Sequence, residues 1–158
     1  GVSEDVASKL IGLKGKVAIA NAKIAYQHYL EIFSSDRWQA LAAKGAKPQR
    51  LLWASTGTKN PDYSDVMYVD ELVGADTVNT LPPDTIEACA DHCDPASRIT
   101  ANVEQARQII AALGDEDVAI DLDAVMAELL EEGIEKFIKP FESLMDSLET
   151  KVKQLATI

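Results

Sequence analysis

The sequence predicts a helix-rich α/β protein whose two parallel strands belong to a larger barrel. Residues 50–55 contain a short continuously apolar run, typical of a parallel strand buried on both faces. Residues 76–81 form a second short strand pattern, and the roughly twenty residues between the two suit a right-handed helical crossover. Two such strands do not make a stable sheet by themselves, because a parallel sheet needs further strands and needs helices covering both of its faces. We therefore expect this chain to be the last part of an α/β barrel.

The first helices and strands are predicted from periodicity and from breaker residues. Residues 16–33 lack glycine and proline and carry apolar or small side chains at steps of three and four, which indicates an amphipathic helix. Gly74 ends a second helical pattern, and Pro82 and Pro83 stop the second strand. The helices predicted in this part of the chain cover residues 16–33, 65–73 and 85–92.

The rest of the chain is expected to be helical. One helix is predicted over residues 102–113, followed by a helical pair that is broken at Gly133. We expect the second member of this pair to be kinked or broken at Pro140, because proline removes a helix hydrogen bond. The whole chain, residues 1–158, is predicted to be a single partial domain. Its three sections are helices (1–48), strand–helix–strand–helix (49–92) and C-terminal helices (93–158).

Composition excludes several classes of function. The net charge of −11 argues against nonspecific nucleic-acid binding and against anionic membranes, since both partners would be repelled. No apolar run approaches the roughly 20 residues that span a bilayer, and the first residues are not signal-like. The two cysteines do not make a disulfide framework. These features predict a cytoplasmic protein.

A basic island interrupts the acidic chain and ends on a hydroxyl-rich turn. Residues 37–61 hold five basic residues and no acidic one, whereas residues 115–149 hold twelve acidic residues and two lysines. The turn follows the first strand, and its candidate ligands for a small oxyanion, most plausibly phosphate, are Ser55, Thr56, Thr58 and Lys59. An acidic protein that binds a phosphorylated metabolite needs such a local reversal of potential.

Two other clusters are weaker candidates for metal sites. Cys89, His92 and Cys93 lie at i, i+3 and i+4, so one helical face could gather them, but a closed zinc site needs a fourth ligand. Asp115, Asp117 and Asp121 resemble a calcium loop, yet the required glycine and further oxygen ligands are missing. We expect no metal and no cofactor.

Three segments resemble the C-terminal part of transaldolase: residues 15–38, 50–88 and 129–145. The resemblance is to the longer-chain bacterial branch, some of whose members are fused to glucose-6-phosphate isomerase. It implies a TIM-type (β/α)8 barrel that uses a lysine Schiff base and no cofactor. Such enzymes of the pentose phosphate pathway transfer a dihydroxyacetone unit from sedoheptulose 7-phosphate or fructose 6-phosphate to an aldose phosphate.

The resemblance places the site residues in that barrel. It implies that residues 51–55 are the seventh strand and residues 77–81 the eighth, with ligands at their carboxyl ends. In this family the phosphate group of the substrate is held partly by a serine and a basic residue, and the matching positions in this sequence are Ser55 and Lys59. Many shorter-chain relatives have an arginine, so Lys59 would supply a point charge instead of a bidentate fork. Asn79, at the mouth end of the second strand, is a possible substrate contact.

The family's catalytic segments are missing from this sequence. The Schiff-base lysine, the acid/base glutamate and the catalytic aspartate of transaldolases lie on early barrel strands. The lysines before the first strand all read as surface residues: Lys9, Lys14, Lys16, Lys23, Lys44 and Lys47. We therefore expect no catalytic residue in this chain and no transaldolase chemistry by this chain alone.

Two alternatives remain open at the level of sequence. One is a stand-alone phosphate-binding module, and the other is a helical interaction module without catalysis. The expected partners are sugar phosphates, with a second copy of the chain or the N-terminal half of the barrel as candidate protein partners.

Overall fold

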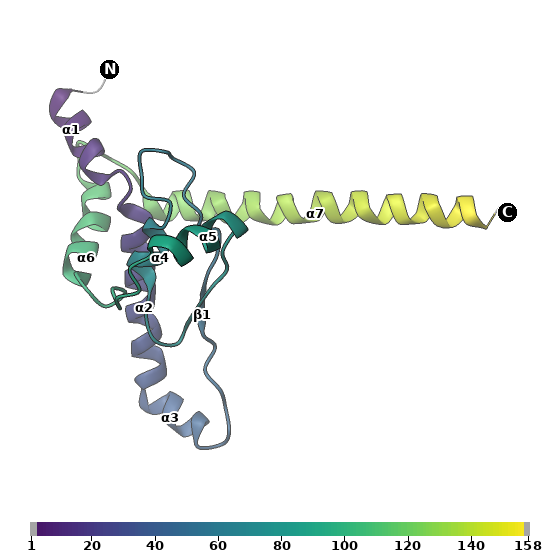
Figure 1. Cartoon of the computed structure of the whole chain (residues 1–158), viewed down its shortest axis with the longest axis horizontal. Helices are drawn as coiled ribbons and strands as arrows, with labels where there is room; N and C mark the ends of the chain where they lie inside the picture. Colours follow the sequence, from purple (N-terminus) through teal and green to yellow (C-terminus); the bar gives the residue numbers. More distant parts are fainter. Residues whose placement is uncertain (1–2, 157–158) are drawn as a thin grey trace. The chain divides into compact units, whose positions relative to one another are not determined.

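A computed structural model describes residues 3–156, which form ten helices and strands in two compact units that divide between residues 118 and 119. The first unit holds both strands (Figure 1). No helix among the described residues combines the length and apolar content needed to cross a bilayer. The elements are α1 (Glu4–Leu13), α2 (Val17–Ser34), α3 (Asp36–Ala42), β1 (Leu51–Trp53), α4 (Met67–Leu72), β2 (Thr77–Asn79), α5 (Pro83–His92), α6 (Val103–Ala111), the 3-10 turn η1 (Ala112–Gly114) and α7 (Leu122–Leu155).

The central element of the first unit is α2, which packs against α3, α4 and α6 (Figure 1). Its inner face carries Tyr26 and Tyr29, whose ring centroids lie 5.8 Å apart. Phe33 continues this series at 4.8 Å from Tyr29, and Trp38 of α3 meets Phe33 edge-on. Aromatic pairs at these separations add to the stability gained from burial. The apolar stripe read from residues 16–33 therefore forms the core of this unit.

The two strands form a parallel pair, as predicted from their separation. Leu51 pairs with Thr77, and Trp53 pairs with Asn79. Leu51 and Trp53 pack against the core cluster around Tyr26, while Leu52 on the opposite face is 53% exposed. One face of the sheet is thus covered by helices and the other is open, although parallel sheets are normally covered on both faces.

Close backbone contacts hold the crossover between the strands. Gly74 lies so near the fully buried Ile99 that an added Cβ would stand 2.1 Å from the Ile99 Cγ2 atom. The Tyr26 hydroxyl donates to the Ala75 carbonyl at 3.0 Å, and the Trp53 indole donates to the Leu72 carbonyl at 3.2 Å. These bonds give the tyrosine hydroxyl and the indole N–H hydrogen-bond partners, while the aromatic rings that carry them are buried.

The predicted order of helices and strands in residues 16–113 is confirmed, although both strands and the helix before Gly74 are shorter than expected and α5 begins earlier, at Pro83. The strands span three residues each instead of six, and the helix predicted over 65–73 covers Met67–Leu72. The helix predicted over 102–113 ends as an α-helix at Ala111 and continues as a 3-10 turn. With one neighbour each, the strands lack the pairing that would extend them. The assignment of the whole chain to one partial domain stays a prediction.

The predicted break in the C-terminal helical pair is wrong. Leu122–Leu155 form one α-helix of 34 residues that includes Gly133 and Pro140 (Figure 1). A glycine in a helix interior costs about 1 kcal/mol and a proline about 3 kcal/mol, so each weakens a helix without always ending it. The Asp121 side chain caps the start by accepting from the Ala124 N–H, and pairs such as Lys139–Glu135 at 2.9 Å support the middle.

Candidate functional site

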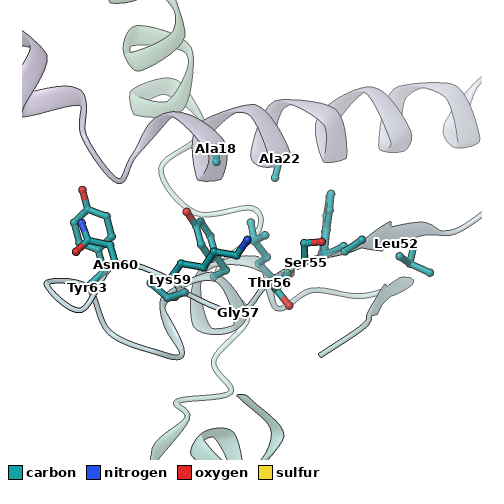
Figure 2. A pocket seen from close by; sticks show the side chains of 14 residues that line it. Ala18, Ala22, Leu52, Ser55, Thr56, Gly57, Lys59, Asn60 and Tyr63 are labelled. Atoms are coloured by element: carbon teal, nitrogen blue, oxygen red, sulfur yellow. Dashed lines mark hydrogen bonds between the residues drawn. The ribbon is translucent and has the colours of Figure 1, made fainter. Parts of the chain in front are cut away.

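A cavity of about 560 Å³ lies at the carboxyl end of β1. It is bounded by α2 on one side and by the loop after β1 on the other (Figure 2). Ala18 and Ala22 of α2 face it, and their small side chains leave room between the helix and the loop. Its lining includes all four residues predicted to bind phosphate: Ser55, Thr56, Thr58 and Lys59.

The loop leaves β1 through an unusual backbone conformation. Ser55 has φ of 58°, in the left-handed region that non-glycine residues seldom adopt. Two residues later, a Cβ on Gly57 would stand 3.0 Å from the Pro82 ring and 3.2 Å from the Thr85 hydroxyl. Gly57 therefore lets the loop pass close to the start of α5. These features turn the chain sharply at the strand end, where parallel α/β folds bind their ligands.

Ser55 and Lys59 are the predicted ligands that remain available. Both side chains are exposed, and Lys59 forms no ion pair with any residue in the range 3–156. Figure 2 shows the Ser55 hydroxyl and the Lys59 amine beside the cavity, on the loop that faces α2. A hydroxyl and an unpaired ammonium are the groups that an oxyanion needs.

Thr56 and Asn79 are engaged with each other. Thr56 is 4% exposed, and its hydroxyl donates to the Asn79 side-chain oxygen at 2.8 Å. The Thr80 carbonyl lies 3.4 Å from the same hydroxyl. This bond ties the loop after β1 to the end of β2. Substrate contact by Thr56 or Asn79 stays a prediction, and it would require this bond to open.

The Thr58 hydroxyl is enclosed and has no hydrogen-bond partner in the described part of the chain. An enclosed polar atom without a partner is unfavourable by about 1–3 kcal/mol. A ligand in the cavity could reach this hydroxyl only if the loop shifted. Thr58 therefore differs from Ser55 and Lys59, although all three line one cavity.

Two tyrosines that the sequence analysis did not identify also line the cavity. Tyr63 and Tyr68 flank it together with Asn60, and Tyr63 also packs against Gly15. Their side chains combine a flat apolar face with a hydroxyl, a combination that suits a sugar. The signal in the sequence was their position within ten residues of the loop. Tyr68 lies on α4 and Tyr63 packs against Gly15, so the spacing alone did not identify them.

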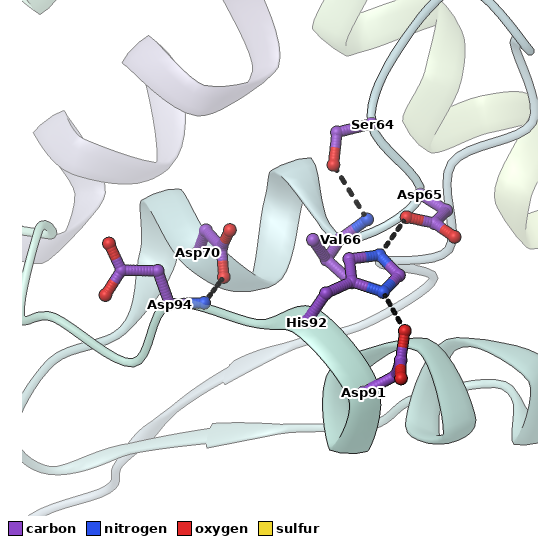
Figure 3. Close-up of polar contacts among 7 residues, drawn as sticks. All are labelled: Ser64, Asp65, Val66, Asp70, Asp91, His92 and Asp94. Atoms are coloured by element: carbon purple, nitrogen blue, oxygen red, sulfur yellow. Dashed lines mark hydrogen bonds and ion pairs between the residues drawn. The ribbon is translucent and has the colours of Figure 1, made fainter.

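Cys89, His92 and Cys93 interact with different neighbouring residues and do not form a common ligand set. The His92 imidazole lies between Asp65 at 2.8 Å and Asp91 at 3.1 Å (Figure 3). The hydrogen bond with Asp65 raises the pKa of His92, with a further contribution from Asp91. Burial raises the pKa of the Cys93 thiol to about 12, helped by Cys89 and Asp70. A metal ion would have to displace these interactions, and no cluster in residues 3–156 is arranged to hold one.

The aspartates that resemble a calcium loop also have other roles. Asp117 pairs with Lys9, and Asp121 caps α7. Neither carboxylate is free to join a cage of oxygen ligands without giving up that role.

The chain matches one known family over most of its length. The sequence profile of the family described as transaldolase/fructose-6-phosphate aldolase matches residues 3–148. The chain belongs to this family. The match confirms the resemblance that was drawn from residues 15–38, 50–88 and 129–145.

Several curated transaldolases are similar to this chain. A transaldolase 2 from Nostoc sp. is 68% identical over 151 residues, which cover 96% of this chain and 40% of the relative. A transaldolase from Trichodesmium erythraeum is 64% identical over 155 residues, covering 98% of this chain and 41% of the relative. One from Saccharopolyspora erythraea is 49% identical over 143 residues, covering 90% and 38%. The chain thus spans about two fifths of the length of these relatives and corresponds to their C-terminal part.

The match to transaldolases agrees with the fold described above. The sequence predicted the C-terminal part of a TIM-type barrel. The structure is a helix-rich segment with two parallel strands, and it matches the C-terminal part of these proteins, as that prediction requires. The open face of the sheet, with Leu52 more than half exposed, is the face that a closed barrel would turn inward.

The sequence analysis predicted the exposure of one lysine of this chain wrongly. Lys23 was expected at the surface, but it is 5% exposed, and its Nζ atom donates to Glu71 at 2.8 Å. The pair links α2 to α4 beside a second cavity of about 330 Å³, which shares no lining residue with the first. A lysine on a helix is predicted to be exposed to solvent unless its ion-pair partner is known. Glu71 lies 48 residues away in the sequence, so the local pattern did not indicate the pair.

Proposed function

We propose that this chain supplies the phosphate-binding end of a transaldolase site. The full activity would transfer a dihydroxyacetone unit between sedoheptulose 7-phosphate or fructose 6-phosphate and aldose phosphates. The observation that carries the proposal is the placement of Ser55 and Lys59 on one cavity at a strand end, in a chain of this family. In a protein of net charge −11, an unpaired lysine beside a hydroxyl supplies the local positive potential that a phosphate needs.

Each cavity residue has a distinct role in this proposal. The Lys59 ammonium neutralises the phosphate, and the Ser55 hydroxyl donates one hydrogen bond to it. The Thr56–Asn79 bond holds the loop, so these two residues act through its position. Tyr63 and Tyr68 flank the sugar, whose reactive carbon would extend toward the barrel interior.

The Schiff-base lysine and the acid/base carboxylates of the activity would come from residues outside this chain. This part of the proposal rests on the family's placement of those residues on early strands. The proposal needs no cofactor, because a lysine imine supplies the electron sink for carbon–carbon cleavage. A cytoplasmic location stays a prediction from composition.

Ligand titration followed by amide chemical shifts tests the phosphate site. Fructose 6-phosphate and inorganic phosphate should produce saturable shifts confined to residues 55–60 and their neighbours. Unphosphorylated fructose should produce none, because it lacks the charged group. Lys59→Met should weaken fructose 6-phosphate binding about tenfold or more, which corresponds to losing one charge-assisted contact.

A matched control separates the site from general charge. Lys44→Met removes another exposed lysine, one that does not line the cavity, so it should leave the affinity unchanged. Equal losses in both variants, or equal shifts with fructose, would contradict a phosphate site at this loop.

A further inference from the structure

The loop after β1 is held at two points. On the side of β1, Thr56 is almost fully buried, and its hydroxyl donates to the Asn79 side chain. On the far side, the Asn60 side-chain oxygen accepts from the Asp62 N–H at 3.0 Å, and the Asn60 carbonyl accepts from the Tyr63 N–H at 3.2 Å. Figure 2 shows the loop between these points running along the cavity. Thr56 and Asn60 therefore fix the two ends of a segment of three residues.

This segment, residues 57–59, is free between its two fixed ends. Within the described part of the chain, no hydrogen bond or ion pair involves its backbone or its side chains. Backbone without such bonds belongs to the least stable parts of a fold and moves at little cost. The 57–59 segment can therefore change conformation while both of its ends stay in place.

The Thr58 hydroxyl favours a movement of this segment. Its oxygen is enclosed without a hydrogen-bond partner in the described chain, although Thr58 lines the same cavity as Lys59. Residues of this chain already cover the oxygen, so further strands of a barrel could not reach it unless the loop moved. An enclosed hydroxyl without a partner is unfavourable. Any movement that gives Thr58 an acceptor is therefore favourable.

We propose that the 57–59 segment closes on a bound phosphate and that the Thr58 hydroxyl then becomes one of its ligands. The inference rests on the phosphate site proposed above. Phosphate fits because the ligand must accept a hydrogen bond and must carry negative charge beside the Lys59 ammonium. Thr58 gains this hydrogen bond without giving one up, whereas Thr56 would first have to release Asn79.

Replacing the hydroxyl by a methyl group tests the state of Thr58 in the free protein. Thr58→Val removes an enclosed hydroxyl without a partner, so the ratio of folded to unfolded chain should rise about fivefold or more. Thr56→Val is the matched control two residues away: it breaks the bond to Asn79 and should lower this ratio. Urea denaturation without phosphate measures both variants. A Thr58→Val chain no more stable than the wild type would overturn the proposal.

Titration with inorganic phosphate tests the bound state. Thr58→Val should bind phosphate about tenfold more weakly than the wild type, because one hydrogen bond to a charged ligand is lost. Thr58→Ser keeps the hydroxyl and should keep the wild-type affinity. A variant that is more stable than the wild type and yet binds less tightly is not expected from a purely structural threonine. Equal affinity of Thr58→Val and the wild type would overturn the closure and leave the phosphate site standing.

Failure of the phosphate site itself gives a different result. If the wild type does not bind inorganic phosphate, both the site and the closure are wrong. Amide hydrogen exchange adds a readout of the movement. The N–H groups of residues 57–59 should exchange more slowly when phosphate is bound, because they leave water as the segment closes. Unchanged exchange at these amides in the phosphate-bound wild type would overturn the closure.

Discussion

Lys23 shows how one buried charge can organise two helices. Its ammonium is enclosed by α2 and α4 and pairs with Glu71, whose side chain is 39% exposed. The pair fixes α2, whose other face borders the proposed phosphate cavity through Ala18 and Ala22. Lys23 is thus a structural residue of the first unit, and removing it tests how strongly α2 depends on α4.

We predict that Lys23→Met lowers the free energy of unfolding by about 1–2 kcal/mol. Breaking a fully buried pair costs about 3–5 kcal/mol, but the exposure of Glu71 reduces the penalty for leaving its charge unpaired. Urea denaturation measures the change. Lys9→Met, which removes the surface pair with Asp117, is the control and should change stability little. A Lys23→Met variant as stable as wild type would mean that α2 is held by its apolar face alone.

His92 makes stability depend on pH through its two carboxylate neighbours. The contacts with Asp65 and Asp91 raise the pKa of His92 above its ordinary value of 6.5, so the folded state binds a proton more tightly than the unfolded state does. This stabilisation is complete below pH 6.5 and is lost as the pH rises through the raised pKa. His92 in turn lowers the pKa of Asp65 from 3.8, so the contribution of Asp65 is lost as the pH falls through that lowered pKa.

We predict that His92→Gln destabilises the protein more at pH 5.5 than at pH 8.5. Glutamine keeps a hydrogen-bonding side chain and removes the positive charge, so the difference isolates the charge. Denaturant midpoints at both pH values give the comparison, and an NMR titration of the imidazole should show a midpoint above 6.5. A pH-independent difference would mean that the bonds to Asp65 and Asp91 act without the proton.

Exposure of single side chains was the hardest property to predict from the sequence. The shared location of Ser55 and Lys59 was predictable, because hydroxyls and a cation after an apolar run form a local pattern. Lys23 and Tyr68 were not, since their environments are set by contacts with residues far along the chain. The Thr56–Asn79 bond likewise joins the loop after β1 to the end of β2, which only the parallel pairing brings together.

At the scale of elements, breaker residues predicted ends correctly only where packing agreed with them. Gly74 ends the α4 region in a place where nothing larger fits beside Ile99. Gly133 and Pro140 did not end α7, and no atom lies within 4 Å of a Cβ added at Gly133. Propensity sets a cost for a residue, whereas its surroundings decide whether the element ends there.

We predict that Gly74→Ala lowers the free energy of unfolding by about 1–3 kcal/mol, because the new methyl group would overlap the Ile99 side chain and force the crossover to shift. Gly12→Ala is the matched control: it adds the same methyl group in α1 with nothing within 4 Å, and it should stabilise the helix slightly. Thermal denaturation of both variants measures the difference. Equal stability would show that the Gly74 backbone can move at no cost.

At the scale of the whole molecule, strand order and direction were predictable because chain length between two apolar runs limits their connection. The parallel direction followed from that limit and is confirmed. The length of the strands and the open sheet face did not follow from the sequence, since both depend on how many neighbours a strand has. The cavity could be located from the strand end, but its tyrosine wall depended on the packing of α4.

The division of labour in the proposed activity leads to one prediction for the whole chain. Treatment of the purified chain with fructose 6-phosphate and borohydride should leave its mass unchanged, because no lysine in residues 3–156 is both buried and placed on the proposed phosphate cavity. Lys23 is buried, but it is engaged by Glu71 beside the other cavity. A full-length transaldolase treated in parallel is the positive control for trapping.

Lys23→Met then decides how an unexpected adduct would be interpreted. An adduct on the wild type that disappears in this variant would identify Lys23 as an imine-forming residue, and the second cavity as a reactive site. An adduct that persists in Lys23→Met would place the reaction on an exposed lysine, as in nonspecific glycation, and peptide mapping would locate it. Only the first result would contradict the assignment of the chemistry to residues outside this chain, because a catalytic imine at neutral pH forms on a shielded amine whose pKa is lowered, whereas exposed lysines react slowly and without selectivity.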